Sequence, residues 1–509
     1  MGKESAFGAV LRNRSLRRLQ YAVLGSMLGR MAFIVAIAVW AFDEGGPALV
    51  GIAGFVRMAP TAIVSPFAAA FADRFPRGRV MAASDLGRAV VCLAIAAAVA
   101  ADATPAVVLV LLAVMAVLAS LFEPARAAIV PSLVDRPELL TASNAVSSAV
   151  NSAAYFLGPA VGAFLLAVSS VEVTFVFTAV ALVWSALFAL TLRPHDADAG
   201  EAAAPAEPAG WLGEVREGVR VVREDRGLLL LVGLFGVQTV IAGAVSVFTV
   251  VVALDVLDAG NAWVGILDAA GGVGALLGVT IVTRLTDGGR LSNGVITGLL
   301  LWGLPLILIA LVDTKAAAVA ALLLIGVGDT AIDVSSYTLV QRLVPEELLG
   351  RVFGLVETVV VAGLAVGALV APLVIELIGI EAALIAFACL PAVILVATRS
   401  LRHLDKRAVV DERPRTLLRG LPMFSVLPLP VLDGLAMAAR PLEVADGATV
   451  VSQGDAGDRY YVVDDGEVDV VIDGAVVTRL APGDGFGELA LLRERPAPRA
   501  WSRAARFAC

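Results

Sequence analysis

LVDRPELLTASNAV at residues 133–146 is matched in outline by LVPEELLGRVFGLV at residues 343–356. A second related pair is ADRFPRGRV at 72–80 and TRLTDGGRL at 283–291. Each of these segments joins one long apolar run to the next. Related segments at equivalent places in two halves of a chain are typical of membrane proteins built from internal repeats. The sequence therefore predicts two parallel repeats.

The apolar runs around these segments are long enough to cross a bilayer, which takes about 20 helical residues. Of the 509 residues, 59% are hydrophobic and only 17% are charged, whereas about a quarter of a soluble domain is charged. We predict an all-α polytopic membrane protein, embedded in the lipid bilayer, with six helices in each repeat. The predicted spans are 19–42, 48–71, 80–101, 105–126, 143–168 and 171–192, followed by 227–254, 262–284, 293–312, 316–340, 352–378 and 381–400.

Composition divides the chain into five parts. The two six-helix halves cover 1–192 and 227–400. The segment 193–226 between them is rich in Ala, Pro, Gly and acid, which predicts a flexible cytoplasmic linker that ends in a short amphipathic helix. A second linker, 401–420, precedes a polar C-terminal domain at 421–509.

The placement of arginine predicts the orientation of the spans, because Lys and Arg near helix ends stay on the cytoplasmic side. Basic residues gather at the N-terminus, in the central linker and in every second loop. Acidic residues occupy the alternate loops, where Lys315 is the only base. We expect both termini in the cytoplasm and a location in the plasma (inner) membrane, of a bacterium if the preference for Arg over Lys reflects a GC-rich genome.

Charge and motif content argue against several classes of function. The net charge of −8 opposes binding to nucleic acid, because nothing offsets repulsion by the phosphates. The three cysteines lie far apart and the two histidines fall in polar segments, so we expect no metal site. GGVGALLG at 271–278 lies inside a predicted membrane helix, where glycines serve packing. We expect neither an enzyme nor a resident cofactor.

The turn after the second predicted span carries an acid followed by a short basic turn. The residues are Asp73, Arg74, Arg77 and Arg79. This pattern resembles the signature of the major facilitator superfamily, in which a glycine is usual where this chain has Ala69. The resemblance implies a charged latch between the two halves at the cytoplasmic side. Ordinary positive-inside charge is the alternative.

Two further segments extend the resemblance over residues 10–400. LGPAVGA, which contains Gly158, Pro159 and Gly162, is similar to part of the motif of drug and proton antiporters in this superfamily. Simple helix packing is the alternative, because a Gly-Pro step bends a helix and small residues four apart allow close contact. FEPARAAIVPSL at 122–133 resembles the exporter-like branch that includes siderophore and macrolide efflux proteins. The resemblance implies a secondary transporter of a small solute or drug-like molecule.

Charged residues inside the predicted spans are candidates for function, because a charge at the bilayer centre costs at least about 2.5–3.5 kcal/mol. Asp329 and Asp333 are four residues apart, so both carboxylates lie on one helix face and can share a proton. We predict that this pair accepts the coupling proton. The alternative is that each pairs with Arg30 or Arg57 and is structural. These two arginines are also candidates for contact with an anionic substrate, and Arg57 for anchoring a bend at Pro60.

Two other charged pairs are not expected to take part in the chemistry of transport. Asp85 and Arg88 lie three residues apart on one helix face, which favours mutual pairing. Glu123 and Arg126 have the same spacing at a helix end, where snorkelling or gating is expected.

The polar C-terminal domain has the period-2 pattern of short strands separated by glycine turns, which predicts a small β-roll. FGELALL at 486–492 resembles the phosphate-binding segment of cyclic nucleotide-binding domains of the catabolite-activator type. In that family the segment opens a short helix whose amides hold the cyclic phosphate. The resemblance implies that Gly487, Glu488, Leu489 and Ala490 contact cyclic AMP or cyclic GMP, with Glu488 on the ribose hydroxyl.

The last residues depart from that family. The chain has RPAPRAWSRAARFAC at 495–509, so Arg499 can neutralise the phosphate only if the loop is longer, and Ala497 otherwise marks loss of this arginine. The final strands, the hinge helix and the lid helix of the family are predicted to be missing, which makes the domain incomplete. A roll without ligand is the alternative for the domain. For the whole chain, the rival hypothesis is a non-transporting membrane sensor, whose helices serve to anchor the cyclic nucleotide-binding domain.

Overall fold

The computed structural model divides the chain into two compact units, Met1–Arg407 and Ala408–Cys509. The boundary falls inside the segment predicted as the second linker. The structure describes residues 10, 12–72, 75–134, 137–192, 211–285, 291–344, 346–392, 412–421, 423–424, 432, 435–436, 439–452, 459–472, 475–487, 500–502 and 505–508.

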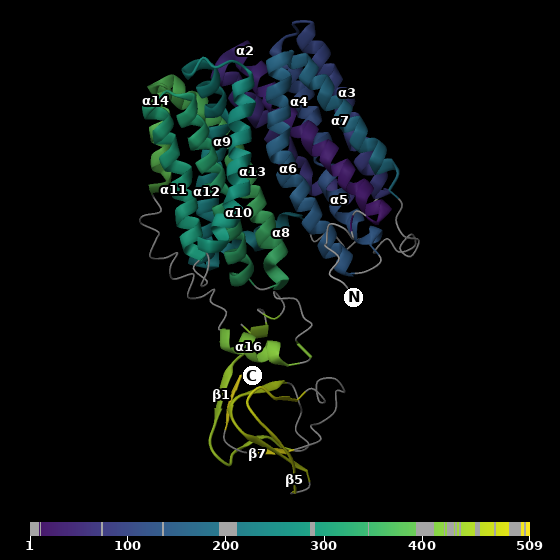
Figure 1. The fold of residues 1–509 in the computed structure, drawn as a ribbon, viewed down its shortest axis with the longest axis vertical. Helices are drawn as coiled ribbons and strands as arrows, with labels where there is room; N and C mark the ends of the chain where they lie inside the picture. The colour runs from purple at the N-terminus through teal and green to yellow at the C-terminus, as the bar shows by residue number, and fades with distance from the viewer. Residues whose placement is uncertain are drawn as a thin grey trace. The chain divides into compact units, whose positions relative to one another are not determined.

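The first unit is a bundle of long helices (Figure 1). Its first half contains α2 (Arg14–Ala72), α3 (Arg77–Ala100), α4 (Pro105–Ala119), α5 (Phe122–Ile129), η1 (Val130–Leu133), α6 (Pro137–Val168) and α7 (Val171–Leu190). Two helices are merged in α2 across a kink at Gly45 and Gly46, whose backbone angles are not helical. The kink falls between the first two predicted spans.

The second half of the bundle begins with an amphipathic helix in the segment predicted as the central linker. The elements are α8 (Trp211–Glu224), α9 (Arg226–Val251), η3 (Val252–Val256), α10 (Ala262–Leu285), α11 (Leu291–Leu311), α12 (Lys315–Leu343), α13 (Glu346–Ile378), α14 (Ile380–Cys389) and η4 (Leu390–Ala392). The Asp225 carboxylate caps α9 by accepting the backbone N–H groups of Gly227 and Leu228 at 2.7 and 3.3 Å.

Ten helices of the described part are long and apolar enough to cross a membrane. One of them, Arg14–Thr61, contains the kink in α2. The last predicted span, 381–400, is described only as far as residue 392. Large apolar side chains on these helices face outward, as lipid requires; Leu377 is 80% exposed and Leu311 70%. The chain is therefore a multi-pass membrane protein.

Glycines bring α10 and α12 into close contact. A Cβ on Gly274 would meet the backbone of Leu323, and one on Gly326 would meet the backbone of Gly271. Close approach of backbones through small residues is the usual way to pack helices in lipid. This close contact fixes the position of α12, the helix that carries Asp329 and Asp333.

The second unit contains α16 (Glu412–Gly420) and two four-stranded antiparallel sheets, with strand orders β1-β8-β3-β6 and β2-β7-β4-β5. Val463, Val468 and Phe486 form a buried core. The predicted β-roll is therefore present. The strands are β1 (Pro441–Val444), β2 (Thr449–Val451), β3 (Tyr461–Gly466), β4 (Val468–Ile472), β5 (Ala475–Leu480), β6 (Gly485–Phe486), β7 (Ala500–Ser502) and β8 (Ala505–Ala508).

The last residues of the chain contribute strands to the roll, whereas the completeness of the domain stays a prediction. The arginine-rich segment supplies β7 and β8, which lie in the interior of the two sheets. Trp501 stands opposite Val470, and Phe507 stands opposite Val463. The frequent arginines of this segment hid its strands in the sequence.

Candidate functional site

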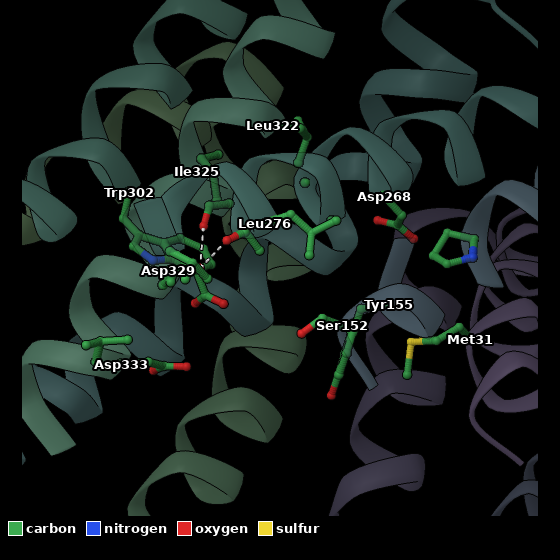
Figure 2. A pocket seen from close by; sticks show the side chains of 18 of the residues that line it. Met31, Ser152, Tyr155, Asp268, Leu276, Trp302, Leu322, Ile325, Asp329 and Asp333 are labelled. Atoms are coloured by element: carbon green, nitrogen blue, oxygen red, sulfur yellow. Dashed lines mark hydrogen bonds between the residues drawn. The ribbon is translucent and has the colours of Figure 1, made fainter. Parts of the chain in front are cut away.

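A cavity of about 600 Å³ lies between the two halves of the helical unit. Helices α2 and α6 contribute residues from the first half, and α10, α11 and α12 from the second half. In Figure 2, Trp302, Asp329 and Asp333 gather at the left of the view, and Asp268, Tyr155 and Met31 lie at the right. Other lining residues include Ile34, Ser152, Pro159, Leu276, Leu322, Ile325 and Thr330.

The two predicted proton acceptors both line this cavity. Asp329 and Asp333 are half-buried on one face of α12. The Gln238 side chain of α9 donates a hydrogen bond of 3.0 Å to the Asp329 carboxylate. Among the described residues neither aspartate has an ion-pair partner, so the alternative pairing with Arg30 or Arg57 is not found there.

A third carboxylate, Glu357 on α13, lies close enough to Asp333 to repel it electrostatically. Its oxygen accepts a hydrogen bond of 2.9 Å from the Tyr337 hydroxyl. Asp329, Asp333 and Tyr337 follow one another at four-residue intervals on α12, so they share a face. The acidic face of α12 therefore continues beyond the cavity toward an exposed carboxylate.

The two predicted basic candidates interact with residues of the opposite wall. Arg30 donates hydrogen bonds to the Met27 sulfur at 3.1 Å and the Tyr155 hydroxyl at 3.4 Å, and its guanidinium stands 5.9 Å from the Tyr155 ring centre. Arg57 is half-buried and interacts electrostatically with Asp268. Neither arginine is among the residues that line the cavity, although both Tyr155 and Asp268 are.

Asp268 and Trp302 were not assigned to the site from the sequence. Asp268 is a charge in the middle of an apolar span, and this signal made it one of the candidates for function, although no role was assigned to it. Trp302 is 5% exposed, lines the cavity, and its indole Nε1 has no hydrogen-bond partner among the described residues. No sequence pattern distinguishes this tryptophan from one that only packs.

Both of the other charged pairs form ion pairs, which confirms the predicted pairing of Asp85 with Arg88, whereas snorkelling or gating by Glu123 and Arg126 stays a prediction. Arg88 Nη1 lies 2.8 Å from the Asp85 carboxylate, and Arg126 Nε lies 2.7 Å from Glu123. The first pair is deeply buried and shares the Ser26 hydroxyl, which donates to Asp85 and accepts from Arg88 at 3.2 and 3.1 Å. Each of these charges has its counter-charge on the same helix, and none of the four residues lines the cavity.

The predicted gating motif is described in part. The Arg77 guanidinium donates a hydrogen bond of 2.6 Å to the Ala128 carbonyl oxygen, which ties the start of α3 to α5. Arg79 is exposed. Asp73 and Arg74 lie outside the described residues, so the latch stays a prediction.

The Gly-Pro segment of α6 packs against α2. A Cβ on Gly158 would meet the Met31 side chain, and one on Gly162 would meet Val35 at 3.3 Å. Pro159 lines the cavity. This segment therefore positions α6 where it forms part of the cavity wall.

Of the residues assigned to cyclic nucleotide binding, the structure describes Gly487. Its φ of 106° is in the region that favours glycine, and it directly follows β6. Glu488, Leu489, Ala490 and Arg499 lie outside the described residues, and their roles stay predictions.

Two family profiles match the chain. The Major Facilitator Superfamily matches residues 21–360 and 262–439. The cyclic nucleotide-binding domain matches residues 441–506. The chain therefore belongs to the Major Facilitator Superfamily. It is a transporter of this superfamily that carries a C-terminal cyclic nucleotide-binding domain.

Individual relatives match the two parts separately. The uncharacterised MFS-type transporter YfiS of Bacillus subtilis (strain 168) is 27% identical over 354 residues, which are 65% of this chain and 79% of YfiS. A cAMP-dependent protein kinase regulatory subunit of Schizosaccharomyces pombe (strain 972 / ATCC 24843) is 40% identical over 80 residues, 16% of this chain and 19% of that protein. The crystal structure of the nucleoside transporter NupG has a TM-score of 0.64 at 12% identity, over 76% of this chain and 99% of that one. The last likeness concerns the fold alone.

Proposed function

We propose that this transporter exports a small, drug-like solute in exchange for protons. The observation that carries the proposal is the pair Asp329 and Asp333, which lines the cavity between the halves without an ion-pair partner among the described residues. The direction of transport rests on the resemblance of 122–133 and of the Gly158 segment to exporters. The domain limits 1–192, 227–400 and 421–509 are part of the same proposal.

The proposed mechanism follows from the like charge of Asp329 and Asp333 and from their position in one cavity. Two carboxylates four residues apart repel each other, and a proton bound by one of them relieves the repulsion. Rocking of the two halves would expose the cavity to each side of the membrane in turn. A proton that enters from one side and leaves on the other then drives the solute the opposite way.

Flux in liposomes tests this proposal. The purified full chain is reconstituted, a pH gradient is imposed, and release of internal protons is recorded while a broad panel of solutes is added. We expect solute-dependent proton flux that Asp333→Asn abolishes. The matched control Asp313→Asn, in an exposed loop, should retain it. Absence of solute-dependent proton flux across the panel would contradict proton coupling.

We further propose that a cyclic nucleotide regulates the transporter. The family match over 441–506 and the β-roll support a ligand at the segment that begins with Gly487. Isothermal titration of cyclic AMP and cyclic GMP into the full chain should show binding, and Glu488→Ala should remove it. Glu467→Ala, which breaks an exposed ion pair with Arg479, is the control. No binding by the unaltered protein would contradict the proposal.

The positive-inside pattern supports a location in the plasma membrane with both termini cytoplasmic. Green fluorescent protein fused after residue 509 should be fluorescent, whereas a periplasmic phosphatase fused there should be inactive. Fusions in the loop at 312–314, between α11 and α12, should behave in the opposite way. The same result at both places would contradict the predicted orientation.

A further inference from the structure

The lining of the cavity between the halves has one sign of charge. Asp268, Asp329 and Asp333 line it, and no Lys or Arg is among its described lining residues. Two basic groups outside the lining interact with residues of the opposite wall, Arg30 with Tyr155 and Arg57 with Asp268. On the other side Glu357 adds negative charge behind Asp333. The end of the cavity formed by α12 is therefore acidic and without a local counter-charge.

A buried hydrogen-bond donor lies on the same wall. The indole of Trp302 is almost fully buried, at 5% exposure, and its Nε1 has no acceptor among the described residues. An unpaired buried donor is unfavourable, because its hydrogen bond to water has been lost. An acceptor on a bound molecule would restore that bond. Figure 2 shows Trp302 on the same side of the cavity as Asp329 and Asp333.

Most of the remaining lining is apolar, with Ser152, Tyr155 and Thr330 as its uncharged polar residues. Leu276, Leu322 and Ile325 cover it from α10 and α12, and Met31 and Ile34 cover it from α2. A pocket with apolar walls and a few polar groups that converge on one side binds an amphipathic molecule in a fixed orientation. The polar groups here differ in kind: the carboxylates attract a cation, and the indole N–H requires an acceptor.

We infer that the transported solute is an organic cation with an apolar body and a hydrogen-bond acceptor. Its positive group lies against Asp329 and Asp333, its acceptor receives the Trp302 N–H, and its apolar body packs on Leu322 and Ile325. This inference rests on the proposed transport function and names the substrate class. An anionic solute, which the arginines Arg30 and Arg57 would favour, is the opposite outcome of the test.

Two probes of similar size and opposite charge test whether the site prefers a cation or an anion. Binding of tetraphenylphosphonium and of tetraphenylborate is measured with the full chain in lipid nanodiscs, and binding to empty nanodiscs is subtracted. We expect the cation alone to bind above background. Asp329→Asn should weaken its binding at least about tenfold, which is ~1.4 kcal/mol. The matched control Asp313→Asn should leave the dissociation constant unchanged.

A third probe tests the acceptor. Rhodamine 6G is a cation with an ester carbonyl, whereas tetraphenylphosphonium has no acceptor. Trp302→Phe keeps an aromatic wall and removes the N–H donor together with the ring that carries it, so we expect it to weaken rhodamine 6G binding by about three- to tenfold. Tetraphenylphosphonium loses only the contact with the missing ring, so its binding to the same variant should weaken less than that of rhodamine 6G, and the binding that remains shows that the variant is folded.

Three results would overturn the inference: preference for tetraphenylborate, cation binding that Asp329→Asn does not weaken, or equal losses of both cations in Trp302→Phe. These are binding measurements and need no proton gradient. If cations bind as expected but no solute-dependent proton flux occurs in liposomes, the proposed coupling is wrong while the substrate class stands. If flux occurs with anions only, the substrate class is wrong while coupling stands.

Discussion

Two pairs of charged residues in the membrane helices have opposite surroundings. Asp85 and Arg88 on α3 are 0% and 3% exposed and are joined at 2.8 Å, with Ser26 bonded to both. Asp329 and Asp333 on α12 have like charge, are half-buried, and open on a cavity. A membrane charge whose counter-charge lies on the same helix serves structure. A membrane charge that faces open space is available to a proton or a solute.

Removal of one partner from the buried pair should have the largest effect on stability. Arg88→Met leaves the Asp85 carboxylate buried and uncompensated, and loss of one partner of such a pair costs about 3–5 kcal/mol. Thermal unfolding in detergent, followed by size-exclusion chromatography with fluorescence detection, measures the loss. The double variant Asp85→Leu/Arg88→Met should recover most of it. Equal losses in the single and double variants would show that packing, and not the unpaired charge, is responsible.

A change in the backbone contact beneath the aspartates should have an intermediate effect. In Gly326→Ala the new methyl group meets the backbone of Gly271, and overpacking of this kind costs about 1–3 kcal/mol. The same thermal assay measures it. Gly233→Ala in α9, where a Cβ meets no atom within 4 Å, should not destabilise. If both variants behave alike, the α10–α12 contact is looser than described.

The ion pair between α8 and α13 should matter least among the paired charges. Arg351 lies 3.0 Å from Glu217, and the two side chains are 40% and 43% exposed. An exposed pair contributes about 0.2–1 kcal/mol, so Glu217→Gln should shift the unfolding midpoint only slightly. Salt at 1 M should abolish the difference. A shift as large as that of Arg88→Met would mean that α8 is needed to hold the bundle together.

The unpaired carboxylates should contribute almost nothing to stability. Asp333→Asn removes a charge that repels Asp329 and Glu357, so we expect a change within about 0.5 kcal/mol or a small gain. Its effect should instead be on the pH dependence of transport, which should flatten while folding is retained. A strongly destabilised Asp333→Asn would assign this aspartate to structure and erase the contrast with Asp85.

Periodicity and length predicted most of the helical unit. The apolar run at 105–126 became α4 and α5, and the interruption between 42 and 48 became the kink at Gly45 and Gly46. Pairing at three-residue spacing also identified Asp85 with Arg88, because both partners lie on one helix. Local signals of this kind depend on residues close in sequence, so they can be extracted from one chain.

Contacts between distant helices could not be predicted in this way. Trp302 and Asp268 reach the same cavity from α11 and α10, and Gln238 reaches Asp329 from α9. Nothing in the spacing of these residues encodes how the helices pack. In the second unit, β7 and β8 were missed because strands this short have no periodicity of their own, and their place depends on partners earlier in the chain.

The strand order of the C-terminal roll has a consequence for biosynthesis. Among the described strands, β1 pairs only with β8, and β2 only with β7. While the ribosome is still making the segment between them, β1 and β2 have no neighbours and present open edges, which readily join other chains. The roll can close only after residues 500–508 have left the exit tunnel. A nascent chain that stalls earlier would carry inserted membrane helices and an aggregation-prone fragment.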